Sequence, residues 1–190
     1  MRTVVLGPKP AELEAMIERR RASGADLHDE VWPGEYHVAP APHPAHAYLD
    51  QQLAEVLGPL ARTAGLLITG PFNLGEPDDY RVPDRAVHRH LPIEVWVPTA
   101  AVVVEILSLD DETWNKLEFY ATHHVDELLI VGVADRSVTW LALTDNGYAT
   151  VDESGLLGAS VEGLSERIDW PTLHDIRSPP FDRAEPAIRG

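Results

Sequence analysis

Two stretches in the first half of the chain have apolar residues at the spacing of an amphipathic helix. Residues 10–22 begin with acidic side chains and end with arginines, the order that the helix dipole favours. Residues 45–63 carry a longer apolar stripe and stop just before Gly65, a residue type that commonly ends helices. The pattern predicts a short helix followed by a long one, whose apolar stripe comprises Tyr48, Leu49, Leu53, Val56, Leu57 and Leu60.

Turn residues between short apolar segments predict two hairpins. Pro33-Gly34 separates EVW from EYHV, so residues 30–38 read as the first hairpin. Asn146-Gly147, the strongest kind of short hairpin signal, joins the two halves of residues 137–151. Further apolar runs predict short strands at residues 66–69, 72–74 and 80–82.

Two nearly continuous apolar runs predict the centre of a sheet. They are residues 101–107 (AVVVEIL) and residues 127–133 (ELLIVGV). A helix that starts at Asp110 or Asp111 and runs to about His124 separates them, so the three elements form a crossover between parallel strands. The order of elements predicts an α/β (α+β) fold, with a mixed, curved β-sheet flanked by helices.

The length of 190 residues suits one domain with a proper core. We expect a helical lead-in at residues 1–26, the domain at 27–177 and a proline-rich tail at 178–190. The chain has no cysteine, which excludes disulfides, thiolate zinc sites and a cysteine nucleophile. Neither a signal peptide nor a membrane-spanning run is evident, so a cytoplasmic location is the default expectation.

The formal net charge of −16 bears on which ligands the protein binds. Proteins that grip duplex DNA by its phosphates usually present a basic face, and here the long-range field repels nucleic acid. A site where divalent cations neutralise clustered carboxylates is itself acidic. The charge therefore argues against DNA binding through a basic surface, but it leaves a metal-dependent site open.

Glu105 is the most informative single residue. Side chains alternate across a strand, so Val103, Glu105 and Leu107 share one face of the predicted central strand. An unpaired carboxylate buried there costs on the order of several kcal/mol, which requires a cation, a lysine or an arginine beside it. An ordinary buried Glu–Arg pair, or a strand end that reaches solvent, would satisfy the same pattern.

Asp84 and Lys116 are the next candidates for chemistry. Asp84 follows Pro83 at a strand end, although Pro-Asp is also a common turn pair. Lys116 is one of two lysines against thirteen arginines, and at about 1.5 Å rise per residue it could reach back to the strand of Glu105. A lysine there can activate water or stabilise charge on a phosphorane. The alternative is a surface lysine paired with Glu112.

The remaining candidates are weaker. Glu35, in the first hairpin, either completes a carboxylate cluster or is simply exposed. His88 and His90 form a His-x-His pattern that could bind a metal from one strand face, but no third ligand is evident. His123 and His124 suit the carboxyl end of a helix.

The order and spacing of several short motifs resemble a known family. The chain is similar to the "putative restriction endonuclease" (Uma-type) branch of the PD-(D/E)xK nuclease superfamily over roughly residues 27–175. The similar segments are 34–40 and 44–46 (the opening hairpin and the start of the long helix), 82–84 (VPD), 103–108 (VVEILS), 116–120 (KLEFY), 127–131 (ELLIV), and 137–140 and 147–148 (the closing hairpin).

The resemblance implies a restriction-endonuclease-like fold and assigns roles to particular residues. Asp84 and Glu105 would be metal ligands, and Lys116 the catalytic lysine, placed on the helix instead of two residues after the acid. Position 107, where the usual motif puts lysine, is Leu107 here, and Ser108-Leu109 replaces the family's Ser-Pro.

The resemblance further implies Glu35 as an accessory acid and His46 facing the site from the long helix. The function implied is a metal-dependent endonuclease that hydrolyses DNA, with Mg²⁺ or Mn²⁺ held by carboxylate oxygens and with paired subunits. Two alternatives remain open at this point. One is a catalytically inactive nuclease-fold module for binding or regulation, and the other is a histidine-based metal hydrolase at His88 and His90.

Overall fold

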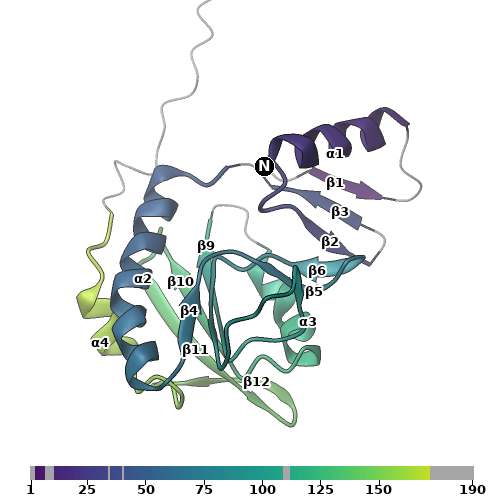
Figure 1. Ribbon diagram of the computed structural model, residues 1–190. Coiled ribbons are helices and arrows are strands. Elements are labelled where there is room, and N and C mark those ends of the chain that lie inside the picture. The colour runs from purple at the N-terminus through teal and green to yellow at the C-terminus, as the bar shows by residue number, and fades with distance from the viewer. Residues whose placement is uncertain (1–2, 7–10, 34, 40, 109–111, 172–190) are drawn as a thin grey trace, which may run out of the picture.

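The computed structural model describes residues 3–6, 11–33, 35–39, 41–108 and 112–171 (Figure 1). Several features expected from the sequence lie outside these residues. They are the helix cap at Asp110 or Asp111, Gly34 of the first turn, Leu109, and the tail at 178–190. Among the described residues, no helix combines the length and the apolar character needed to cross a membrane.

One six-stranded mixed sheet is built from the first half of the chain, in the order β1-β3-β2-β6-β5-β8. Its neighbours are antiparallel except for β5 and β8, which run parallel. The hairpin predicted at residues 30–38 is confirmed as β2 and β3. The strands are β1 (Thr3–Leu6), β2 (Glu30–Trp32), β3 (Glu35–Val38), β5 (Asn73–Glu76), β6 (Asp79–Arg81) and β8 (Trp96–Val97).

A second six-stranded sheet has the order β12-β11-β10-β9-β7-β4. β9 and β10 lie in its interior and are parallel, as the apolar runs and the crossover predict, and the other pairs are antiparallel. The strands therefore form two mixed sheets, where the sequence suggested one. The strands are β4 (Leu67–Thr69), β7 (Arg85–His88), β9 (Val102–Leu107), β10 (Glu127–Gly132), β11 (Ser137–Thr144) and β12 (Gly147–Val151).

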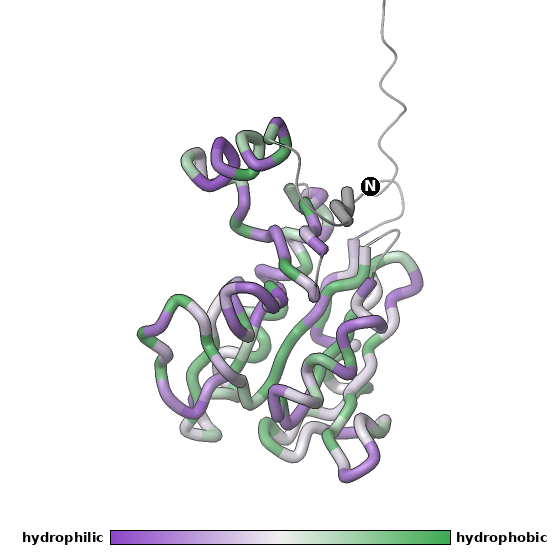
Figure 2. Tube along the Cα trace, turned by 90° about the vertical axis from the view of Figure 1, so that its right-hand side faces the viewer, coloured by the Kyte–Doolittle hydropathy of each residue, from purple (hydrophilic) through white to green (hydrophobic). Residues whose placement is uncertain are grey.

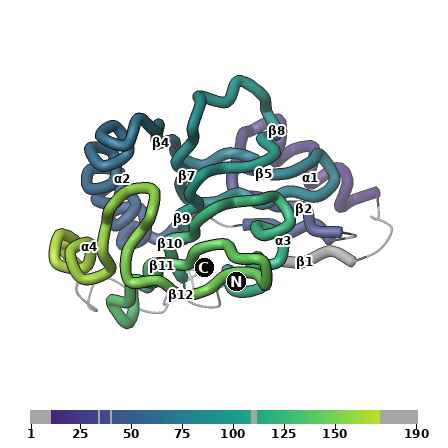
Figure 3. The backbone as a smooth tube through the Cα atoms, turned by 90° about the horizontal axis from the view of Figure 1, so that it is seen from below, coloured from purple at the N-terminus to yellow at the C-terminus, as the bar shows by residue number. Residues whose placement is uncertain are grey.

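Helices cover both faces of the second sheet, and Figure 3 shows α2 and α4 on one side and α3 on the other. Val102, Val104 and Ile106 pack in one apolar cluster with the buried side of α2 (Pro44–Thr63) and with α4 (Val161–Arg167). Val103 packs in a second cluster with Phe119 and Tyr120. Figure 2 shows hydrophobic segments, drawn in green, running through the middle of the molecule. Glu105 shares the face of Val103, as the alternation of side chains predicts, and this face is directed toward α3.

The predicted helices are present with adjusted ends. α1 (Ala11–Ser23) and α2 match residues 10–22 and 45–63, and the chain leaves α2 through Gly65 at a φ of 72°. The helix expected to reach His124 is shorter and has two parts, a 3₁₀ turn η1 (Thr113–Lys116) and α3 (Leu117–Thr122). Threonine and asparagine in the first part are weak helix formers, which favours the tighter turn.

Four elements were not assigned from the sequence, namely β1, β7, β8 and α4. β1 pairs with β3, so the first 26 residues, expected as a helical lead-in, also contribute a strand to the first sheet. β8 has two residues and α4 has seven, too short for a clear period. The domain limits at 27 and 177 stay a prediction.

Candidate active site

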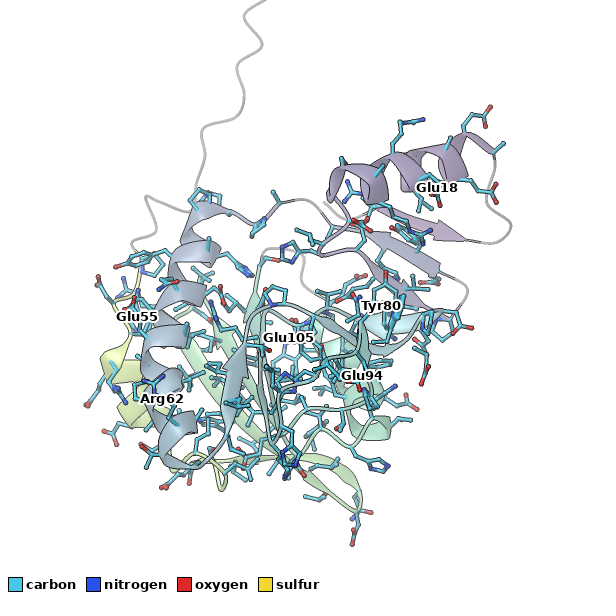
Figure 4. The ribbon with its side chains drawn as sticks, viewed as in Figure 1. Glu18, Glu55, Arg62, Tyr80, Glu94 and Glu105 are labelled. Carbon is cyan, nitrogen blue, oxygen red and sulfur yellow. The ribbon has the colours of Figure 1, made fainter. Side chains whose placement is uncertain are left out.

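The three residues predicted to carry chemistry come together where the two sheets meet. Lys116 Nζ lies 3.0 Å from Glu105 Oε1, and Asp84 Oδ2 accepts a hydrogen bond of 2.7 Å from the backbone N–H of Ile106, next to Glu105. Figure 4 shows Glu105 in the middle of the molecule, between α2 and α3. The chain thus brings together residues that are 32 positions apart at the widest, 84 to 116.

Asp84 lies between β6 and β7, directly after Pro83. Its side chain is 17% exposed, and its Oδ1 lies 2.9 Å from Nε2 of His46 on α2. Burial by itself would lower the pKa of His46, but the hydrogen bond and the charge of Asp84 outweigh it and raise that pKa. His46 therefore faces Asp84 from the long helix, in the position that the resemblance implies.

Glu105 is buried, and both of its hydrogen bonds converge on one oxygen. Oε1 accepts from Lys116 Nζ and from the hydroxyl of Tyr120, whereas Oε2 has no hydrogen-bond partner among the described residues. Burial raises the pKa of Glu105 to about 7; Lys116 opposes this shift, and the charges of Asp84 and Glu30 add to it. The carboxylate is thus held in a place where a further positive charge would stabilise its ionised form.

Lys116 is buried. The alternative of a surface lysine paired with Glu112 is therefore wrong. Its side chain is 2% exposed, and its Nζ donates to Glu30 Oε1 at 2.7 Å as well as to Glu105. Glu112 contacts Nδ1 of His37 at 3.3 Å. The ammonium group therefore bridges two carboxylates from two different sheets.

Glu30, from β2, is a site residue that the sequence analysis did not single out. Its carboxylate is buried and accepts from Lys116, from the N–H of Val82 at 3.1 Å, and from Trp32 Nε1 at 2.9 Å. Glu35, predicted as the accessory acid, has a side chain that is 39% exposed and pairs with His37 Nε2 at 3.2 Å. The acid of this hairpin that contacts Lys116 is Glu30.

A second ion pair borders Asp84. Asp50 lies one helical turn after His46 on α2, and its Oδ2 accepts a hydrogen bond of 2.8 Å from Arg85 Nη2. Burial raises the pKa of Asp50, Arg85 opposes the shift, and the charge of Asp84 adds to it. The spacing of four residues from His46 was the signal in the sequence that could have found Asp50.

Comparison with known families shows to which family the chain belongs. The chain matches the Uma2 family model, described as "Putative restriction endonuclease", over residues 10–166. This protein belongs to the Uma2 family. The similarity read from the sequence motifs is thereby confirmed, and it extends upstream to include α1. No curated protein matches this chain.

A solved structure confirms the fold of this Uma2 protein. It is described as a "putative nuclease belonging to DUF820" from Anabaena variabilis, with 15% sequence identity and a TM-score of 0.61. The match covers 73% of the present chain and 90% of the other. The restriction-endonuclease-like fold predicted from the motifs is therefore confirmed.

The donor groups of this Uma2 site suit a hard divalent cation. Asp84 and Glu105 offer carboxylate oxygens, the ligands that Mg²⁺ and Mn²⁺ prefer in proteins. Within the part of the chain that the structure describes, no three or more His, Asp or Glu side chains group into a complete metal site. A cation here would be bound by these two carboxylates and by oxygens of the backbone, of water or of the substrate.

The structure does not support a histidine-based metal site. His88 is buried, its Nε2 lies 3.0 Å from the hydroxyl of Thr69, and its ring meets Phe72 edge-on. His90 is exposed. Since the two rings lie in different surroundings and the described residues provide no third ligand, the His-x-His alternative loses its geometric basis.

Proposed function

We propose that this Uma2 protein is a divalent-metal-dependent endonuclease that hydrolyses DNA phosphodiester bonds, with Asp84, Glu105 and Lys116 as its reacting groups. The observation that carries the proposal is the contact between the buried Lys116 ammonium and Glu105, beside Asp84. Two carboxylates can hold a divalent cation, and a lysine can orient water or stabilise negative charge, roles that serve metal-assisted phosphodiester hydrolysis.

Asp84 and Glu105 would hold Mg²⁺ or Mn²⁺, which neutralises phosphate charge and activates water when bound. The residues of the chain supply the positioning. His46 and the N–H of Ile106 fix the two oxygens of Asp84, and the Tyr120 hydroxyl fixes Oε1 of Glu105, which leaves Oε2 available. Preorganised carboxylates of this kind lose little entropy when they bind a cation.

Lys116 would act on the attacking water and on the charge of the phosphate. Its two carboxylate neighbours favour the charged ammonium, which can orient a nucleophilic water or stabilise negative charge that develops on the phosphate oxygens. Glu30 keeps the ammonium in place from the opposite side. The same two carboxylates oppose departure of a proton from Lys116, so the group acts chiefly as a charged ammonium.

DNA is the proposed substrate and a second copy of the chain the proposed partner, because two paired active sites can cut both strands of a duplex in one binding event. The net charge of −16 means that contact with phosphate depends on bound cations more than on a basic face. The same charge, together with a lysine closed between two carboxylates, favours an inactive binding or regulatory module as the second candidate.

The test is a cleavage assay on single- and double-stranded DNA, with RNA in parallel, in Mg²⁺ and in Mn²⁺. We expect metal-dependent cleavage by the wild type and its loss, by at least about a hundredfold, in Asp84→Asn, Glu105→Gln and Lys116→Met. Glu118→Gln, an exposed carboxylate on the helix that carries Tyr120, is the matched control and should cleave like the wild type. The same metal-independent background in all five proteins would favour the inactive module.

A further inference from the structure

Four side chains and one guanidinium group form a continuous stack beside the candidate site. The ring of His37 lies on Trp32 with centroids 4.4 Å apart and planes 18° apart, and the guanidinium carbon of Arg81 lies 4.3 Å from the Trp32 ring centre. The same carbon lies 4.0 Å from the ring centre of Phe119, which in turn is 4.0 Å from the ring centre of His123. The stack thus connects β3, β2 and β6 with α3.

Arg81 is the central member of this stack, and it is enclosed. It is 4% exposed, and its Nη1 donates to Asp79 Oδ1 at 2.8 Å and to the backbone oxygen of Val31 at 2.9 Å. The guanidinium carbon thus contacts two aromatic rings, an arrangement that planar arginine favours and that the ammonium of lysine cannot reproduce. Because Arg81 is buried, its N–H groups are not presented to a phosphate from solvent, and any function of Arg81 is exerted through its neighbours.

Those neighbours contact, or lie next in sequence to, groups around Lys116. Trp32 donates its indole N–H to Oε2 of Glu30, which accepts from Lys116. Phe119 is the residue before Tyr120 and lies three positions after Lys116. The next residue after Arg81, Val82, donates its backbone N–H to Glu30 Oε1. Arg81 therefore joins the strand of Glu30 to the helix that carries Lys116 and Tyr120.

We propose that Arg81 is a positioning residue, a cationic clamp between Trp32 and Phe119 that keeps the Lys116 ammonium between Glu30 and Glu105. Its catalytic consequence rests on the proposed nuclease function, but the placement of Lys116 does not. Without the clamp, the first sheet and α3 lose the contact that spans them at this point. Lys116 then loses the fixed distance to its two acceptors, whereas the carboxylates of Asp84 and Glu105 stay on their own strands.

Nuclear magnetic resonance of isotope-labelled lysine tests this directly, because the chain has two lysines, Lys9 and Lys116. Lys9→Arg leaves one lysine signal and so assigns Lys116. We expect the Lys116 side-chain signal of the wild type to lie away from that of free lysine, because the ammonium is buried. In Arg81→Met the signal should move toward the free position, with partial return in Arg81→Lys.

Arg89→Met is the matched control, since Arg89 forms an exposed ion pair with Asp126 outside the stack. It should leave the Lys116 signal in place. A folded Arg81→Met protein whose Lys116 signal does not move would overturn the proposal. If Arg81→Met does not fold, Phe119→Leu takes its place, because it removes one of the two rings that contact Arg81 and retains an apolar side chain. The same criterion applies to it.

Cleavage kinetics add a readout that general destabilisation would not mimic. Arg81→Met should lower kcat by about tenfold or more and leave KM nearly unchanged, because Arg81 does not touch the substrate. In a Lys116→Met background the same change should cost nothing further, since it acts through Lys116. Additive losses would contradict the clamp. Absence of cleavage by the wild type would count against the nuclease function, and the lysine signal would still decide the clamp.

Discussion

The ammonium group of Lys116 lies between two carboxylates in the interior of a protein that carries a net charge of −16. Burying three charged groups removes them from water, and this desolvation makes such a triad less stabilising than a well-packed apolar cluster of the same size. A buried triad is thus a weak source of stability. Its presence beside Asp84 is better explained by a task that needs a charged lysine and a carboxylate at fixed distance.

Substitutions of Glu30 and Glu35 by glutamine should differ in their effects on cleavage and stability. Glu30→Gln keeps the shape of the side chain but removes one of the two negative charges that hold Lys116, so we expect cleavage to fall by about tenfold or more. We also expect the free energy of unfolding to fall by about 1–3 kcal/mol, because a buried donor loses a charged acceptor. Cleavage kinetics and urea denaturation measure the two effects.

Glu35→Gln is the paired variant, and its side chain is partly exposed. We expect a stability change within about 0.5 kcal/mol and a smaller effect on cleavage than that of Glu30→Gln. The reverse order, with Glu35→Gln the more damaging to cleavage, would restore Glu35 as the accessory acid and reduce Glu30 to a structural partner of Lys116.

The sequence could not separate these two acids, for a physical reason. Glu30 pairs with His37 across the hairpin and Trp32 pairs with Glu35, so all four side chains share one face of the first sheet. Alternation therefore predicts the face but not the depth. Glu35 lies beside the turn, whereas Glu30 lies at the open end of the hairpin and meets Lys116, whose own position depends on a crossover later in the chain.

At the scale of elements, long periodic segments could be predicted and short ones could not. The stripe of α2 and the apolar runs of β9 and β10 are set by burial on whole faces, which the sequence displays directly. β7 has charged or polar residues at both ends and follows a Pro-Asp pair that reads as a turn. Its strand character comes from pairing with β9 and β4, contacts that no local pattern encodes.

The pairing of β4 with β7 leads to a prediction about pH. His88 is buried at the end of β7, contacts the hydroxyl of Thr69 on β4, and has its pKa lowered from 6.5 by burial. Since the folded-state pKa lies below the unfolded one, the neutral ring contributes stability above the unfolded value, and this contribution is lost as pH falls through the folded value. We expect thermal unfolding between about pH 7.5 and pH 5 to show this loss.

His88→Gln should flatten that pH dependence, because glutamine can also hydrogen-bond to Thr69 and does not titrate. His90→Gln is the control, since its exposed ring leaves the pH dependence of the wild type in place. An unchanged slope in His88→Gln would show that other groups dominate acid destabilisation. Either result is obtained without any assumption about catalysis.

At the scale of the whole molecule, the candidate site lies at the junction of the two sheets. Glu30 comes from the first sheet and Glu105 from the second, and η1 supplies the lysine that joins them. The segment from β6 to β7 passes from one sheet to the other and carries Asp84 at the crossing point. Because each sheet contributes only part of the site, correct docking of the sheets is a condition for its chemistry.

The acidity of the whole molecule predicts an unusual salt dependence of DNA binding. Proteins with a basic face release many counterions, and their affinity falls steeply as salt rises. Here the charge of −16 repels DNA, so we expect little binding without divalent cations and a clear gain when Ca²⁺ is added at constant ionic strength. With Ca²⁺ present, the logarithm of affinity against that of salt concentration should have a shallow slope. Fluorescence anisotropy with labelled DNA measures both effects. A steep fall of the affinity with salt in the absence of divalent cations would reveal a basic binding face, and it would contradict the idea that bound cations mediate contact with DNA.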